Sequence, residues 1–185
     1  MRKREVCAYR NSYGSLYNDD VISPTGKKGE YLRWAWSNEG VIVIPTMGAR
    51  TLLWNMYRYP SGTPSMEFPR GSLQTGETPI EAAIRELQEE TGYLGLNGRK
   101  IGQVHADTGI IETPCHVIQL ETREEDKVAP TNDLMESIAI EPIKLNQGQM
   151  QAYIAKSVIR CSLTISAWGL MLSQQYMRGC QNEAS

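Results

Sequence analysis

The chain has 185 residues, of which 41% are hydrophobic and 22% are charged, as in an ordinary globular protein. This composition excludes collagen-like, coiled-coil and disordered chains, and the length suits one domain that buries a substantial core. The formal net charge of −2 provides no overall basic field, so a nucleic-acid partner is not expected.

Strand patterns occupy the first sixty residues. Short strands with turns are expected over 6–36, where proline and glycine supply the turns. A continuous apolar run at 40–44, which Pro45 should stop, predicts a buried strand, and 51–59 predicts another, followed by a glycine-containing loop. The later expected elements are a helix at 79–91, strands at 101–106, 116–121 and 137–140, a charged loop at 122–133, and helices at 146–154 and 157–176. This mixed order of strands and helices indicates an α+β or α/β fold with a mixed sheet.

The cysteines and the chain start bear on cellular location. Four cysteines, none in a C-x-x-C pair, favour free thiols in a reducing compartment. The basic start lacks the apolar region of a signal peptide, and the most apolar stretch, 157–176, is interrupted by polar residues. No membrane association is therefore expected, and the protein is assigned to the cytoplasm.

The helix at 79–91 has clear boundary signals. Thr78 and Glu81 have the spacing of a capping box, and Pro79 occupies the first helical position. Gly92 is a natural helix stop. These local signals fix both ends of the helix without any tertiary information.

Two faces of this helix differ in chemistry. At 100° per residue, one side forms an apolar stripe that packs on a core: Ile80, Ala83, Ile84 and Leu87. Glu86, Glu89 and Glu90 fall together on another side, with Arg85 one turn from Glu89. Such a carboxylate group is either a solvated acidic face or a site for a hard cation such as Mg²⁺. The spacing alone leaves both interpretations open.

A longer pattern surrounds the helix. From Gly71 the chain reads glycine, five residues, Glu77, seven residues, Arg-Glu-Leu at 85–87, one residue, Glu-Glu at 89–90, one residue, Gly92 and a hydrophobic residue. This pattern resembles the Nudix box of the Nudix hydrolases. Tyr93 stands where the strict family pattern has an aliphatic residue.

The resemblance implies a fold, an activity and a set of ligands. Nudix hydrolases cleave a diphosphate linked to another moiety, use Mg²⁺ or Mn²⁺, and fold as an α/β/α sandwich of the α+β class. By the resemblance, the metal ligands are the backbone carbonyl of Arg70 and the carboxylates of Glu86, Glu89 and Glu90. Glu77 and Arg85 would hold the loop against the helix, and Glu89 and Arg85 are assigned catalytic roles.

Segments outside the box are similar to the ADP-ribose pyrophosphatase branch of the family. They are the strand at 41–45 and the segments 57–60 and 66–71, with Met56 where glutamine is common. The branch usually carries a proline where Thr108 stands, which leaves other nucleoside diphosphate sugars, such as GDP-mannose, open. The resemblance implies hydrolysis to a nucleoside monophosphate and a sugar phosphate. The alternatives are hydrolysis of nucleoside triphosphates or dinucleoside polyphosphates, or a non-catalytic nucleotide sensor.

The same resemblance suggests substrate contacts. Arg58 would bind phosphate, unless it is a surface strand arginine, and Glu67 would contact substrate or pair with Arg58. Glu112 would reach the sugar hydroxyls. Trp34 or its neighbour Trp36 would stack on the base, the alternative being a hydrophobic core or dimer contact.

The general base is expected in an acidic loop before the last strand. Asp133 and Glu136 lie in the matching region, and Glu136 is favoured as base or additional metal ligand. His105 and His116 lack ligand-spaced partners and are interpreted as structural. The chain divides into an N-terminal strand region at 1–38, which could dimerise, and a Nudix domain at 39–185, so a homodimer is expected.

Overall fold

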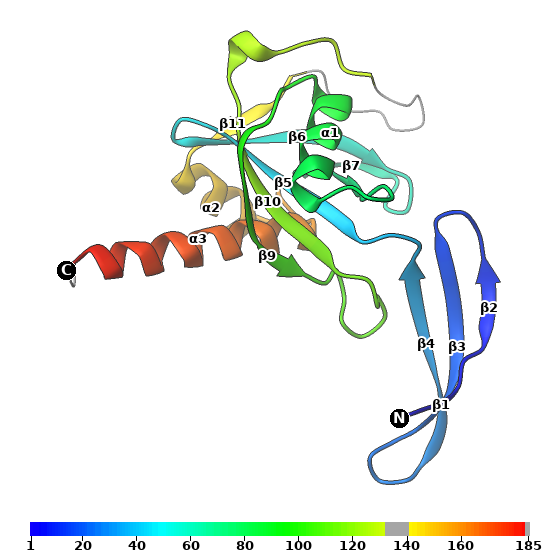
Figure 1. Ribbon diagram of the computed structural model, residues 1–185. Helices are drawn as coiled ribbons and strands as arrows, with labels where there is room; N and C mark the ends of the chain where they lie inside the picture. The colour runs from blue at the N-terminus through cyan, green and yellow to red at the C-terminus, as the bar shows by residue number, and fades with distance from the viewer. Residues whose placement is uncertain (132–140, 184–185) are drawn as a thin grey trace.

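A computed structural model describes residues 1–131 and 141–183 of the protein. It contains two β-sheets, one of four strands at the N-terminus and one of seven strands that carries the helices (Figure 1). The strands are β1 (Arg2–Arg4), β2 (Cys7–Arg10), β3 (Gly14–Ile22), β4 (Lys28–Trp36), β5 (Gly40–Met47), β6 (Arg50–Arg58), β7 (Thr63–Glu67), β8 (Arg70–Ser72), β9 (Leu96–Val104), β10 (Cys115–Glu121) and β11 (Ile143–Leu145). The helices are α1 (Pro79–Thr91), the short 3₁₀ helix η1 (Glu124–Asp126), α2 (Gln147–Ala155) and α3 (Ser162–Glu183).

The N-terminal sheet is antiparallel and is built on β3. One edge of β3 pairs with β4 along its full length, and the other edge pairs with β1 and β2. The sheet stands beside the body of the molecule, at the side away from the end of α3 (Figure 1). Trp34 joins it to the body, because its N–H donates to Ile110 and its carbonyl accepts from Glu112, at 2.8 and 2.9 Å.

The larger sheet has the order β11-β6-β5-β10-β9, with β7 on β6 and β8 on β5. The pair β5–β10 is parallel, in a register that sets Gly40 opposite Cys115 and Thr46 opposite Glu121. The other pairs in this sheet are antiparallel, so it is mixed, as expected. Because β5 and β10 run in the same direction, both strands begin at the same end of the sheet.

Alternation along β5 divides the core into two layers. Val41 and Val43 are fully buried on the face that α1 covers, together with Leu87 of that helix. Ile42 and Ile44 are equally buried on the opposite face, which α2 and α3 cover. An apolar run without polar alternation is what a strand buried on both faces requires. The result is the predicted α/β/α sandwich.

Three sequence predictions about elements need correction. β5 continues through Pro45 to Met47. On one edge of β5, the N–H of Val43 donates to the Pro69 carbonyl next to β8, and pairing with β6 begins only at Thr46. Pro45 lies between these two paired stretches, so its missing N–H breaks no strand hydrogen bond.

The last helix begins later than predicted. Residue 157 has a left-handed φ of 55°, which ends the preceding helical turn, and α3 starts only at Ser162 and runs to Glu183. The segment after β6, expected as a loop, contains β7 and β8. The strand predicted at 137–140 lies outside the described residues. None of the described helices has both the length and the apolar character needed to cross a membrane.

Candidate active site

Helix α1 has the predicted ends. The Thr78 hydroxyl accepts from the N–H of Glu81 at 3.3 Å, and the Glu81 carboxylate accepts from the N–H of Thr78 at 2.8 Å. Gly92 adopts φ 78° and donates its N–H to the Gln88 carbonyl at 2.9 Å. This capping box and left-handed stop fix where the helix lies along the chain and therefore where its acidic side chains project.

Arg85 braces the helix against the loop before it. Its Nε and Nη2 donate to the two oxygens of Glu77, each at 2.9 Å, and Nη2 also donates to the Ser72 carbonyl at 2.9 Å. Its Nη1 lies 3.0 Å from both Glu86 and Glu89. The predicted pair of Glu77 and Arg85 is confirmed. These bonds hold the pKa of Glu77 below its ordinary value and raise that of Arg85.

Gly71 allows Glu86 to approach the backbone of β8. A Cβ at residue 71 would lie 2.0 Å from the Glu86 carboxylate, a distance that real contacts do not reach. The same carboxylate accepts from the N–H of Ser72 at 3.2 Å. Burial raises the pKa of the Glu86 carboxyl, although the Arg85 guanidinium lowers it. The box glycine thus makes room for a carboxylate that would be too close to any other residue.

The remaining acidic residues of α1 differ in exposure. The Glu89 side chain is 46% exposed, whereas Glu90 is buried at 9%. Within the described residues, no three acidic, histidine or cysteine side chains form a metal-binding group, and Arg85 forms ion pairs with Glu86 and Glu89. The donor chemistry nevertheless fits a hard divalent cation, since carboxylate oxygens lie on one helical face and the Glu86 carboxylate packs against Gly71.

A loop crosses the C-terminal end of α1. The N–H of Val128 donates to Gly92 at 2.8 Å, and the N–H of Thr131 donates to Glu89 at 3.0 Å. Thr131, the last described residue before position 141, therefore lies next to the helical turn that carries Glu89. Asp133 and Glu136, the expected sources of the general base, lie outside the described residues.

The model of the NUDIX domain matches residues 37–149, which is more than half of the chain. The chain belongs to the Nudix family. Its match to the mouse ADP-sugar pyrophosphatase is 33% identical over 130 residues and covers 67% of this chain and 56% of that protein.

Two further relatives cover more of this Nudix protein. The ADP-ribose pyrophosphatase of Bacillus subtilis is 28% identical over 150 residues, which cover 77% of this chain and 80% of that one. A crystal structure of an ADP compounds hydrolase superposes with a TM-score of 0.77, 17% identity, and 97% coverage of both chains. This structural likeness confirms the Nudix fold for nearly the whole chain.

Arg58, Glu67 and Arg70 form a cluster beside the box. The guanidinium of Arg58 donates to one Glu67 oxygen at 3.0 and 3.1 Å, and Arg70 lies 3.3 Å from the same oxygen. Glu67 is almost fully buried, and although burial raises its pKa, the two arginines lower it below the ordinary value. The predicted pairing of Glu67 with Arg58 is confirmed.

A central cavity of about 370 Å³ lies next to the box glycine. Its wall includes Arg58, Arg70 and Gly71 and also the apolar side chains of Trp36 and Ile111. Trp36 lines the cavity and Trp34 does not. Trp34 packs edge-on against Trp36 with ring centroids 5.3 Å apart, so it supports the tryptophan that faces the cavity.

Glu112, expected near the sugar, lies in an ion-pair cluster. It pairs with Arg33, whose Nε also donates to the buried Asp19 at 2.7 Å. The neighbouring Ile111 and Thr113 form part of the cavity wall. Glu112 itself does not line the cavity. The sequence did not indicate Arg33 as its partner, because the two residues are 79 positions apart.

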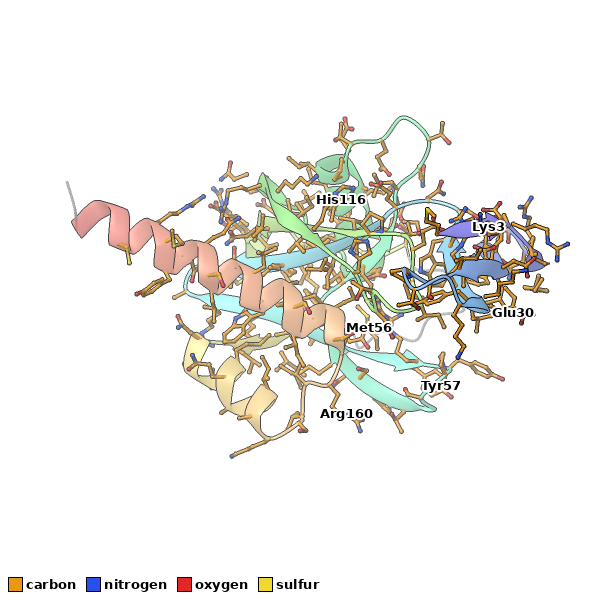
Figure 2. All side chains as sticks on the ribbon, turned by 90° about the horizontal axis from the view of Figure 1, so that it is seen from below. Lys3, Glu30, Met56, Tyr57, His116 and Arg160 are labelled. Carbon is orange, nitrogen blue, oxygen red and sulfur yellow. The ribbon has the colours of Figure 1, made fainter. Side chains whose placement is uncertain are left out.

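His116 lies within the sheet, on β10 (Figure 2). Its Nε2 lies 2.5 Å from Glu39, and its Nδ1 lies 3.1 Å from the amide of Gln103. Both ring nitrogens are therefore engaged by protein groups. This arrangement agrees with the structural interpretation of His116.

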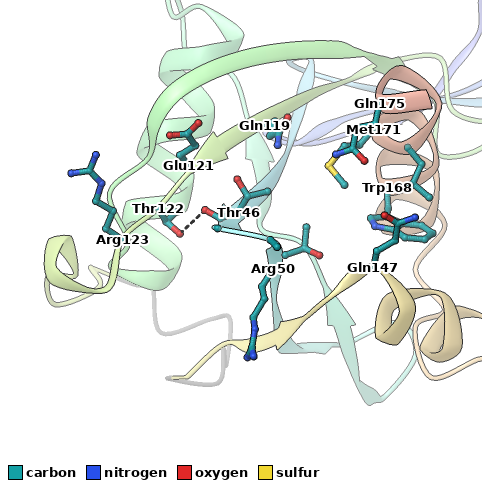
Figure 3. Close-up of a pocket in the computed structure, with 14 residues that line it drawn as sticks. Thr46, Arg50, Gln119, Glu121, Thr122, Arg123, Gln147, Trp168, Met171 and Gln175 are labelled. Carbon is teal, nitrogen blue, oxygen red and sulfur yellow. Dashed lines mark hydrogen bonds between the residues drawn. The ribbon is translucent and has the colours of Figure 1, made fainter. Parts of the chain in front are cut away.

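Figure 3 shows another cavity, of about 430 Å³, between the β5–β6 turn and α3. Thr46 and Glu121 line it, and these two residues are opposite each other at the far ends of β5 and β10. At about 3.3 Å per residue, six positions along β5 place this end about 20 Å from Gly40. The cavity is thus separate from the cluster around the box.

Proposed function

We propose that this Nudix protein hydrolyses the diphosphate bond of a nucleoside diphosphate sugar such as ADP-ribose. The products would be a nucleoside monophosphate and a sugar phosphate. The observation that carries the proposal is the acidic face of α1 placed against Gly71, with Arg58 and Arg70 beside it. The mouse and Bacillus subtilis relatives are named for hydrolysis of ADP-sugars and of ADP-ribose, which supports this substrate class.

The acidic face would hold Mg²⁺ or Mn²⁺. The proposed ligands are the carboxylates of Glu86, Glu89 and Glu90 and the backbone carbonyl of Arg70. When bound, such an ion neutralises diphosphate charge and lowers the pKa of a water molecule. On metal binding, the hydrogen bonds from Arg85 Nη1 to Glu86 and Glu89 would break. The bonds from Arg85 to Glu77 would remain, and they would keep the helix in position.

The chain's own groups would complete the reaction. Arg58 and Arg70 would bind the diphosphate oxygens, because their guanidinium groups lie at the central cavity. Trp36, supported by Trp34, would stack on the base. Glu136 is proposed to accept the proton of the attacking water.

The role of Glu136 has a direct test. We expect Glu136→Gln to lower kcat at least tenfold with little change in KM, because the amide cannot accept the proton. Asp133→Asn is the matched control from the same loop. Unchanged turnover in Glu136→Gln would remove this residue from the mechanism.

Cytoplasmic location and a homodimer are also proposed. Exposed aromatic side chains in the N-terminal strand region, including Tyr9, Tyr13 and Tyr31, support association through this region. Light scattering after gel filtration should give twice the monomer mass of 20.8 kDa. A monomer mass at micromolar concentration would refute the dimer.

A hydrolysis panel tests the function. Purified protein with Mg²⁺ is given ADP-ribose, GDP-mannose, other nucleotide sugars, a dinucleoside tetraphosphate and nucleoside triphosphates, and phosphate is measured after phosphatase treatment. We expect turnover of a nucleotide sugar that Glu90→Gln abolishes. Preference for triphosphates or dinucleoside polyphosphates would change the substrate class. Binding without turnover of any compound would favour a nucleotide sensor.

A further inference from the structure

A third cavity shares Arg58 and Arg70 with the central cavity. Its volume is about 480 Å³, and Arg160 completes a set of three arginines around it. Its remaining polar wall consists largely of hydroxyl groups, among them Ser65 on β7 and Ser162 at the start of α3. Figure 2 shows Arg160 on the same side of the molecule as the β6–β7 strands. We refer to this space as the basic cavity.

Arginines outnumber acidic side chains among the described residues that line the basic cavity. Among the described residues that line it, Glu67 is the one acidic side chain, and Arg58 and Arg70 contact the same Glu67 oxygen. Arg160 forms no ion pair within the described residues. The Arg160 guanidinium therefore brings to the cavity a positive charge that no described carboxylate pairs with, and this charge attracts an anion.

The basic cavity adjoins the central cavity through shared walls, because Arg58 and Arg70 line both. A diphosphate held by these two arginines would have one substituent on each side of them. The central side offers Trp36, Ile111 and Leu163, which suit a base. The basic side offers hydroxyls and Arg160, which suit a sugar that carries hydroxyl groups and negative charge.

We propose that the basic cavity binds the distal sugar of the substrate and that Arg160 selects sugars with an additional anionic group. This inference rests on the proposed function and narrows its substrate class. A carboxylate on the sugar matches the planar fork of a guanidinium, which can donate two parallel hydrogen bonds to it. Arg160 would thus determine specificity, while Arg58 and Arg70 bind the diphosphate common to all substrates.

Binding of two sugar phosphates tests this subsite without any turnover. Glucose 1-phosphate and glucuronic acid 1-phosphate differ only in a hydroxymethyl group or a carboxylate at one carbon. Isothermal titration in buffer with Mg²⁺ gives their dissociation constants for the full-length protein and for Arg160→Gln. Lys156→Gln is the control, since it removes the same charge from an exposed residue four positions away that does not line the cavity.

We expect the protein to bind glucuronic acid 1-phosphate about fivefold more tightly, the scale of a partly exposed ion pair. Arg160→Gln should abolish this preference, and Lys156→Gln should keep it. Equal binding of the two compounds by the unaltered protein, or no binding of either, would overturn the proposal. A preference that survives in Arg160→Gln would overturn it as well.

The outcome is independent of the hydrolysis panel. If the preference is found and no nucleotide sugar is hydrolysed, the subsite stands and the proposed reaction fails. If nucleotide sugars are hydrolysed and UDP-glucuronic acid has no advantage in kcat/KM over UDP-glucose, the selection by Arg160 fails and the reaction stands. Melting curves of the three proteins verify that each variant is folded.

Discussion

Replacement of Gly71 by alanine tests whether the box glycine exists for Glu86. The new Cβ would lie 2.0 Å from the Glu86 carboxylate, so this side chain must leave its place. The obstacle is the end of a flexible side chain, and the β8 backbone can therefore stay where it is. We expect Gly71→Ala to fold and to lose the position of one proposed metal ligand.

The structure sets the size of the effect. Glu86 would lose its bonds to the N–H of Ser72 and to Arg85, while Arg85 keeps Glu77 and Glu89. Because the released carboxylate regains water, the net cost should be about 1–2 kcal/mol. At about 2–4 °C per kcal/mol for a chain of this size, Tm should fall by roughly 2–8 °C. Metal-dependent turnover should fall about 100-fold, the scale of a displaced ligand environment.

Calorimetry, Mn²⁺ titration by electron paramagnetic resonance, and the hydrolysis assay together measure this prediction. Gly29→Ala is the control, because a Cβ at residue 29 meets nothing within 4 Å. Gly71→Ala with normal Mn²⁺ affinity and normal turnover would refute the assignment of Glu86. Loss of folding would refute the argument that only a side chain needs to move.

Three further predictions concern other groups. Burial raises the pKa of the Asp19 carboxyl, but Arg33 and Arg2 outweigh it and hold this pKa below the ordinary value of 3.8. The ionised carboxylate therefore contributes its full stabilisation of the folded protein above pH 3.8 and loses it as the pH falls through the folded-state pKa. A tryptophan fluorescence transition below about pH 4 should disappear in Asp19→Asn. Arg85→Lys should lower Tm by several degrees, because one ammonium group cannot replace a fork that spans Glu77 and Glu89, and a Tm unchanged within 1 °C would contradict this. AMP should quench tryptophan fluorescence, and Trp36→Leu should abolish the quenching; quenching that persists in the variant would place the base elsewhere.

The parts of the fold that were predictable have local causes. The ends of α1 follow from a capping box and a glycine within a few positions of each other, and both were predicted to the residue. β7 and β8 carry proline, serine and glycine and have no strand pattern of their own. They are strands because β6 and β5 offer them backbone partners, and this information is tertiary.

The candidate site also has a part that local sequence could predict and a part that depends on tertiary structure. The three carboxylate partners of Arg85 all lie within eight positions of it, so helical spacing and the resemblance to the box could predict their contact. Arg160 and Arg70 meet around one cavity from positions ninety residues apart, and no local pattern relates them. For the same reason the choice between Trp34 and Trp36 required the structure, which shows which of the two rings reaches the cavity.

The parallel pairing of β5 with β10 has a consequence for the order of folding. The two strands are 75 positions apart in register, and α1 lies between them in the sequence. On the ribosome, the central sheet cannot close until β10 has emerged, whereas β2, β3 and β4 pair with near neighbours. The N-terminal meander should therefore acquire structure early, and it would meet the 110–112 segment that fastens it to the body only late in synthesis.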